Sequence, residues 1–205
     1  MVAAKTLVHL LALAPAGWLA WQVRSELVSG SGALGADPVA AIEHFLGLWA
    51  IRLLMIALAV TPLRHITGQP MLLRFRRLLG LYAFFYATAH FAAWVVLDLR
   101  LDASQIATEI GKRPYVTVGF AAWLLLVPLA ATSFQRAMRA LGRRWGQLHR
   151  LVYVVAVLAV VHFWWLVKSD IREPAFYAGI AALLLGWRVW RRLRAPSRPR
   201  TAAAG

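Results

Sequence analysis

Apolar residues gather in six long runs along the chain, and short polar or charged segments separate them. The runs cover 7–23, 45–63, 78–97, 115–133, 148–167 and 175–190. A helix needs about 20 apolar residues to cross the roughly 30 Å hydrocarbon core of a bilayer. The pattern therefore predicts an all-α, polytopic membrane protein with a bundle of six transmembrane helices. A signal peptide is the alternative for the first run, because Lys5 precedes it, but five further runs follow.

Prolines and a charged residue inside these runs need an explanation. Pro15 and Pro128 remain compatible with spans, because neighbouring helices can satisfy the backbone groups that proline frees. Arg188 lies near the end of the last run, where a long side chain can reach the interface. No internal repeat is visible in the sequence. We expect one transmembrane domain over 1–194 and a disordered, basic cytoplasmic tail over 195–205.

The charged residues divide between the two sides of the predicted bundle. All eight acidic residues fall in the segments that follow the first, third and fifth runs, whereas 16 of the 23 basic residues fall on the opposite side. Basic residues are retained on the cytoplasmic side of membrane proteins. We therefore expect both termini in the cytoplasm and the acidic loops outside.

Composition agrees with this interpretation. The hydrophobic share is 61% of 205 residues, against about 45–50% in soluble domains. The absence of cysteine excludes a disulfide, a thiolate-held iron–sulfur cluster, a CxxCH-attached haem and a thiol nucleophile. A net charge of +15 could indicate a nucleic-acid partner, but that would require basic and aromatic residues interleaved on a soluble face. We expect membrane lipid and no nucleic acid.

Two histidines lie deep in the predicted spans and at similar depth. His90 and His162 lie 12 and 14 residues into spans that both enter from the cytoplasm, or about 18–21 Å from the inner face. Ligation of one haem by two histidines requires such a pair, with the second nitrogen of each ring held by a partner. The alternative is that both are hydrogen-bonded core residues.

Other ionisable residues suggest further contacts. His149 lies 13 residues before His162 on the same predicted helix, or about 20 Å nearer the cytoplasm, where a second haem or the lipid headgroups could hold it. His9 has a similar depth and could also bind iron. His44 lies at the outer interface, where it could contact a quinone or a partner protein.

Three arginines could contact a cofactor. Arg52 is costly in mid-membrane and should pair with an anion such as a haem propionate, or snorkel. Arg76 and Arg77 begin the third span, where both topology and propionate binding would place them. No GxGxxG motif follows a predicted strand, no P-loop is present, and the tail has no room for a nicotinamide or flavin domain. If the protein is a redox protein, its electrons must therefore come from elsewhere.

Ordered motifs across most of the chain carry a resemblance to a known family. They are Gly35-Ala-Asp-Pro38, Ile42-Glu-His-Phe45, Thr61-Pro-Leu63, Arg76-Arg-Leu-Leu-Gly-Leu81, Ala87-Thr-Ala-His90, Arg113-Pro-Tyr115, Leu141-Gly-Arg-Arg-Trp145, Gln147-Leu-His-Arg-Leu-Val-Tyr153 and His162. In these motifs the chain resembles the MsrQ (YedZ) family, the haem-binding membrane subunits of the periplasmic protein-methionine-sulfoxide reductase system. That family belongs to the ferric-reductase-like transmembrane domain superfamily.

The resemblance implies a function in electron transfer across the bacterial inner membrane. It implies one or two b-type haems, with iron ligands at His90, His149 and His162. Electrons would pass from the respiratory quinone pool, or from a cytoplasmic flavin reductase, to MsrP, a periplasmic molybdopterin subunit that reduces methionine sulfoxide in oxidised proteins. The methionine-sulfoxide chemistry would then belong to the partner. The family is also associated with FMN, for which no stretch of this sequence is an evident site.

The chain departs from its superfamily at one position. Relatives have a second histidine on the third span, where this chain has Arg77 or Arg76. His9 is therefore our candidate for the other ligand of a second haem. Two other functions remain alternatives: a stand-alone transmembrane ferric or quinone oxidoreductase, and a haem-free transporter or structural membrane protein.

Overall fold

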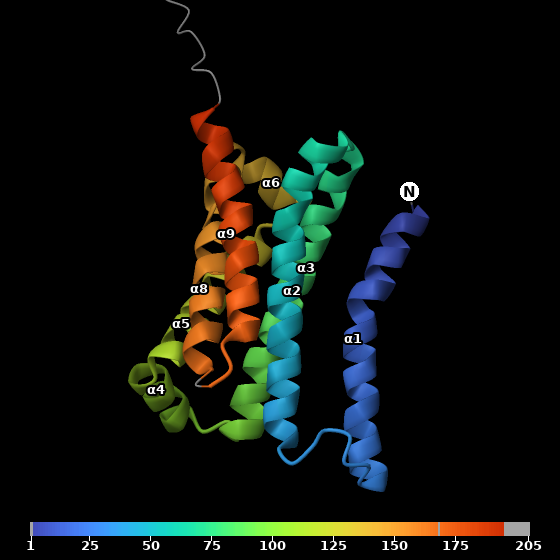
Figure 1. The fold of residues 1–205 in the computed structure, drawn as a ribbon, viewed down its shortest axis with the longest axis vertical. Helices are drawn as coiled ribbons and strands as arrows, with labels where there is room; N and C mark the ends of the chain where they lie inside the picture. The colour runs from blue at the N-terminus through green and yellow to red at the C-terminus, as the bar shows by residue number, and fades with distance from the viewer. Residues whose placement is uncertain (1, 168, 195–205) are drawn as a thin grey trace, which may run out of the picture.

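The computed structural model of the protein describes residues 2–167 and 169–194, which are helical over most of their length and contain no strand (Figure 1). The predicted tail at 195–205 lies outside the described residues. The elements are α1 (Val2–Ser29), α2 (Pro38–Thr67), the 3-10 turn η1 (Pro70–Leu72), α3 (Leu73–Ala93), the π-helical turn η2 (Trp94–Asp98), α4 (Ala103–Lys112), α5 (Pro114–Ala131), α6 (Gln135–Leu141), α7 (Arg143–Leu148), α8 (Leu151–Leu166) and α9 (Arg172–Leu193). The all-helical prediction is confirmed.

Five helical segments are long and apolar enough to cross a membrane. Within the described residues they are Val2–Ser29, Pro38–Thr67, Pro70–Asp98, Pro114–Ala131 and Arg143–Leu166. The chain is therefore a multi-pass helical protein. The predicted sixth span corresponds to α9, whose arginines at 172, 188, 191 and 192 make it too polar to qualify by composition. A sixth crossing and the cytoplasmic position of the termini stay predictions.

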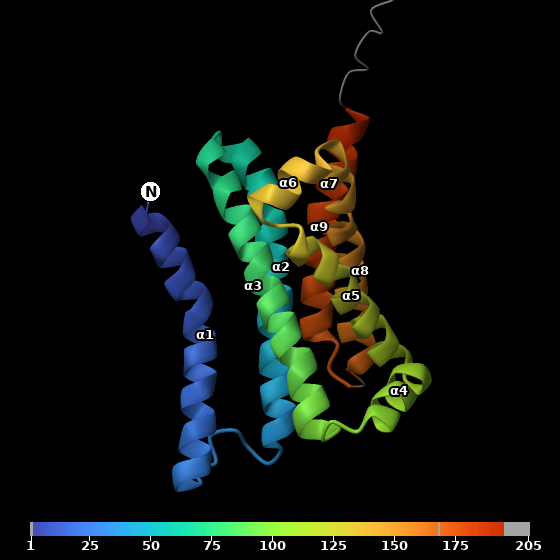
Figure 2. The same cartoon turned by 180° about the vertical axis from the view of Figure 1, so that it is seen from behind.

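Helix α2 forms the centre of the bundle and α1 lies at its edge. Half of the most apolar window of α2 is buried, against 17% for each of the other four candidate spans. The views in Figures 1 and 2 show α1 standing beside α2 and α3 and away from α5, α8 and α9. Helix α1 is thus the least integrated part of the bundle.

The two ends of the bundle differ in charge. The acidic residues all lie in or beside the segments at the end where α4 is found, here called the α4 end. The opposite end, here called the α6 end, carries the short helices α6 and α7 with four arginines, and Arg150 follows them. Such a division is typical of a protein with a fixed orientation in the membrane.

Two prolines interrupt helices and are compensated by side chains from neighbouring helices. The fully buried Tyr86 of α3 bridges α1 beside Pro15: its hydroxyl accepts from the Ala16 amide at 3.0 Å and donates to the Ala12 carbonyl at 2.7 Å. Pro62 has no amide hydrogen to donate to the Leu58 carbonyl, and the guanidinium of Arg188 donates there instead. Arg188 is therefore buried against α2, and the expectation that it reaches the interface was wrong.

Candidate functional site

The two deep histidines face each other across a cavity between two helix pairs. His90 comes from α3 and His162 from α8, and their ring centroids are 6.2 Å apart with an angle of 72° between the rings. Both side chains line the same cavity, which has a volume of about 190 Å³ and a largely apolar lining. The structure thus brings together the two residues that matching depth had singled out.

Each histidine is oriented by a backbone carbonyl on the neighbouring helix. The Nδ1 of His90 lies 2.8 Å from the Glu43 carbonyl on α2, and the Nδ1 of His162 lies 2.7 Å from the Tyr115 carbonyl on α5. A carbonyl only accepts hydrogen bonds, so each Nδ1 carries the hydrogen and each Nε2 keeps its lone pair. Neither Nε2 has a hydrogen-bond partner among the described residues. Two imidazole lone pairs are therefore available in the cavity.

A glycine makes room for each imidazole ring. A Cβ on Gly119 would lie 2.5 Å from the Nδ1 of His162, and a Cβ on Gly47 would lie 3.3 Å from the Nδ1 of His90. Each glycine is one helical turn beyond the residue whose carbonyl holds the histidine. Each histidine ring therefore packs against the same pair of features on the neighbouring helix: a carbonyl that holds its Nδ1 and, four residues later, a glycine that leaves room for the ring. We call this pair the histidine seat.

The two seats are copies of one arrangement, displaced by 72 positions in the sequence. Glu43, Gly47 and His90 in the first half correspond to Tyr115, Gly119 and His162 in the second. The same offset relates every residue of the cavity lining in one half to a residue in the other. The first-half residues are Glu43, His44, Gly47, Leu48, Ala50, Ile51, Leu54, Ala83, Ala87, His90, Phe91 and Trp94. Two helix pairs, α2–α3 and α5–α8, therefore enclose the cavity as approximate repeats, a relation that we did not find in the sequence alone.

His44 belongs to the α4 end of this cavity, whereas Arg52 does not reach the cavity. The Nε2 of His44 lies 3.5 Å from a carboxylate oxygen of Glu173, and its ring lies 6.1 Å from that of Phe163. The Nε of Arg52 donates to the Tyr177 hydroxyl at 3.0 Å, and its guanidinium lies over the ring of Trp49. The structure thus gives Arg52 a hydroxyl and an aromatic face as partners.

His149 lies at the α6 end, in the turn between α7 and α8. It follows the last residue of α7 and precedes α8 by two residues, within the helical segment Arg143–Leu166 that also contains His162. Its Nε2 is 3.0 Å from the Thr132 hydroxyl, and its ring stacks on Trp145 with 4.0 Å between centroids. No second histidine approaches it in the described part of the chain.

The three other predicted contact residues, Arg76, Arg77 and His9, lie in two different places. Arg76 is an electrostatic neighbour of His149, and the guanidinium of Arg77 lies 3.6 Å from the Met138 sulfur of α6. His9 is 2.7 Å from the Tyr82 hydroxyl at the contact of α1 with α3. The structure therefore places Arg76, but not His9, beside His149.

Several residues of the site were missed by sequence reasoning. Gly47, Gly119 and Tyr115 were not recognised as parts of a histidine seat. One signal was present: each deep histidine follows a glycine by 43 positions and precedes a phenylalanine directly. The side chain of Glu43 also lines the cavity, where its buried Oε1 has no hydrogen-bond partner.

The multi-pass helical bundle belongs to a class of transmembrane domain that a family comparison also indicates. The family described as "Ferric reductase like transmembrane component" matches residues 46–160. The matched range includes His90, Gly47 and Gly119, whereas Glu43 and His162 lie just outside it. No solved structure matches the chain.

Three similar proteins carry one name, protein-methionine-sulfoxide reductase heme-binding subunit MsrQ. The protein from Xanthomonas axonopodis pv. citri (strain 306) is 67% identical over 195 residues, which are 95% of this chain and 89% of the relative. That from Xanthomonas campestris pv. campestris (strain B100) is 66% identical over the same shares. That from Bordetella pertussis (strain Tohama I) is 51% identical over 164 residues, or 78% of this chain and 80% of the relative. The chain belongs to the MsrQ family.

Proposed function

We propose that the chain is a haem-binding electron-transfer subunit that holds one b-type haem between His90 and His162. The separation of the two imidazoles is the observation that carries the proposal. Metal–imidazole bonds are about 2.0–2.1 Å long, so two rings on opposite sides of one iron have centroids roughly 6 Å apart. The separation of 6.2 Å in this structure matches that distance.

The surroundings of the pair fit the same group. The carbonyl-held Nδ1 hydrogens leave both Nε2 atoms free to bind a metal, and such outer hydrogen bonds orient the ring and make it a stronger ligand. Glycines at positions 47 and 119 provide the space in which the rings can sit. A porphyrin is larger than the present cavity, so we expect the aromatic lining around Phe91 and Trp123 to move apart on binding.

The bound haem would supply reversible one-electron transfer, and the protein would set its potential and accessibility. His90 and His162 would hold the iron, while the apolar lining from α2, α3, α5 and α8 would exclude water. His44, paired with Glu173 at the rim, would face an electron partner at the α4 end.

The names of the relatives point to a larger system. We infer that this subunit serves a methionine-sulfoxide reductase, with MsrP as the periplasmic partner and a quinone or a cytoplasmic flavin reductase as the donor. In that arrangement the α4 end is periplasmic and the inner bacterial membrane is the location.

A second electron site at the α6 end is a separate proposal. His149, stacked on Trp145 and close to Arg76, would hold a second haem from one side. His9 bonds to Tyr82 instead, which argues for another second ligand. The described residues offer no evident FMN site.

The experiment is haem quantitation on the purified protein from haem-replete cells. His90→Ala and His162→Ala should each remove a low-spin haem signal in the pyridine haemochrome and visible spectra. His65→Ala, which changes a histidine at the exposed end of α2, is the matched control and should keep full haem. Full haem in both ligand variants would refute the assignment, and a colourless wild-type protein would favour the haem-free alternative.

A further inference from the structure

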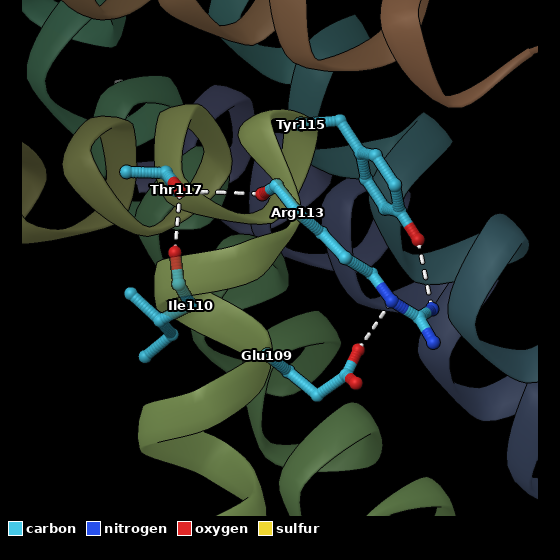
Figure 3. Close-up of polar contacts among 5 residues, drawn as sticks. All are labelled: Glu109, Ile110, Arg113, Tyr115 and Thr117. Carbon is cyan, nitrogen blue, oxygen red and sulfur yellow. Dashed lines mark hydrogen bonds and ion pairs between the residues drawn. The ribbon is translucent and has the colours of Figure 1, made fainter.

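The helices that carry the two seats begin in different ways. On α2, the Asp37 carboxylate caps the first turn by accepting from the Ala40 amide at 3.0 Å. Helix α5 has no side-chain cap of this kind. Its start is held instead by contacts with α4, which precedes it directly in the chain (Figure 3).

Four side chains make these contacts with each other and with the backbone, and we call them the α4–α5 latch: Glu109, Arg113, Tyr115 and Thr117. The Nε of Arg113 lies 2.5 Å from the Glu109 carboxylate, and its Nη1 donates to the Tyr115 hydroxyl at 3.0 Å. The Thr117 hydroxyl lies 2.5 Å from the carbonyl of Ile110 and 3.2 Å from that of Arg113. The latch therefore ties the last turn of α4 to the first turn of α5.

The far end of α4 is fixed independently of the latch. The Asp102 carboxylate accepts from the Ser104 hydroxyl and from the Ser104 and Gln105 amides. The Ser104 hydroxyl, together with these amides, lowers the pKa of Asp102 below its ordinary value. Asp102 is thus charged at neutral pH, and α4 is an ordered element on which the latch can act.

Tyr115 connects the latch directly to a proposed iron ligand. Its hydroxyl is bound by Arg113, while its carbonyl accepts the Nδ1 hydrogen of His162 at 2.7 Å. A rotation of the first turn of α5 would therefore move the hydrogen-bond acceptor of His162. The equivalent residue on the other side, Glu43, has no such link, and its Oε1 lacks a partner.

The latch is accessible from the α4 end of the molecule. The side chain of Arg113 is 54% exposed and that of Glu109 is 22% exposed. We propose that the latch positions His162. By holding α4 against the first turn of α5, it would set the reduction potential of the haem and how tightly the haem is retained. The proposal rests on the proposed function, because it requires iron at His162.

The expected direction follows from the hydrogen bond to the ring. Donation from Nδ1 to a carbonyl increases the basicity of the imidazole, and a more basic ligand favours ferric iron. Loss of the latch weakens this bond, so the haem of Arg113→Ala should be easier to reduce. Disturbing an outer-shell partner of a metal ligand commonly costs 10–100-fold in affinity or activity.

The test compares three variants of the full chain in detergent by redox titration, electron paramagnetic resonance and haem transfer to apomyoglobin. Arg113→Ala should raise the ferrous-to-ferric ratio at fixed potential about tenfold, or about 59 mV for one electron, and speed haem loss by a similar factor. Arg113→Lys keeps the positive charge, so its reduction potential and its rate of haem loss should lie between those of Arg113→Ala and the wild type. Arg172→Ala is the matched control, because it removes an exposed arginine that pairs with Asp170 at the same end.

Tyr115→Phe provides a second measurement, since it removes only the hydroxyl. It should shift the potential in the same direction, and adding it to Arg113→Ala should have little further effect. If Arg113→Ala and Arg172→Ala keep the wild-type potential, resonance signal and haem-loss rate, the latch proposal fails while the haem site stands. Absence of haem from the wild type would instead overturn the proposed function.

Discussion

At the scale of single residues, the site depends on two backbone positions without side chains. Gly47 and Gly119 are equivalent, but they are not equally tight. The Cβ of an alanine at 119 would lie 2.5 Å from the Nδ1 of His162 and overlap the ring. The Cβ of an alanine at 47 would lie 3.3 Å from the Nδ1 of His90. The second histidine therefore tolerates less change in its seat than the first.

We expect Gly119→Ala to displace the His162 ring and to weaken haem binding by about 10–100-fold, the usual cost of disturbing a ligand's support. Gly47→Ala needs a shift of only a few tenths of an ångström and should weaken haem binding less. Haem-to-protein ratios and rates of haem transfer to apomyoglobin measure both variants, with Gly17→Ala, where nothing lies within 4 Å of the added carbon, as the control. A larger loss of haem binding in Gly47→Ala than in Gly119→Ala would contradict this prediction.

Some of these residues could be predicted from the sequence and others could not. His90 and His162 were identified because burying an imidazole in a membrane is costly and their depths agree. The glycines gave no such signal, since glycine is common in membrane helices and its role depends on which ring packs against it. The two-residue turn that separates α7 from α8 at His149 is not visible in hydropathy, because the apolar residues Leu148 and Leu151 flank it.

At the scale of elements, the positions of the long helices follow from hydropathy, but their ends do not. The run at 7–23 became a helix over Val2–Ser29, and the run at 45–63 became Pro38–Thr67. Helix propensity and the Asp37 cap continue these helices beyond the apolar core. Short α4, α6 and α7 were not predicted, because each is too polar or too brief to form an apolar run.

The hydrogen bonds of Tyr86 hold helix α1 against α3. Tyr86→Phe would remove the hydroxyl that bonds both the Ala12 carbonyl and the Ala16 amide beside Pro15. We expect a loss of about 1–2 kcal/mol, in the upper range for interhelical hydrogen bonds in membranes, with faster amide exchange in α1 around Ala16. Hydrogen exchange by mass spectrometry and thermal unfolding in detergent measure these effects.

Tyr82→Phe is the control for this prediction, because it removes a hydroxyl from the same helix at the more exposed contact with His9. Its effect on α1 should be smaller. Unchanged exchange near Ala16 in Tyr86→Phe would show that the bridge does not hold the helix.

At the scale of the whole molecule, the separation of charge predicts how the bundle lies in the membrane. The chain has no native cysteine, so a single introduced thiol reports one position. We expect Ser104→Cys, on α4, to react with a membrane-impermeant maleimide in intact cells whose outer membrane is permeabilised. Ala140→Cys, on α6, should react only after the inner membrane is opened. Labelling in the reverse order would invert the proposed topology.

The repeat of the two hairpins has a consequence for how a haem would enter. The 72-position correspondence implies an approximate half turn about the long axis of the bundle that relates α2–α3 to α5–α8. Such a turn would exchange the two faces of a haem between His90 and His162. Haem b is itself nearly symmetric under such a turn, apart from the placement of its vinyl and methyl groups. Discrimination between the two orientational isomers then falls to the positions where the repeats differ, such as Ile51 against Trp123 and Leu48 against Phe120. The bulkier half of the lining, rather than the ligands, would select the isomer that persists.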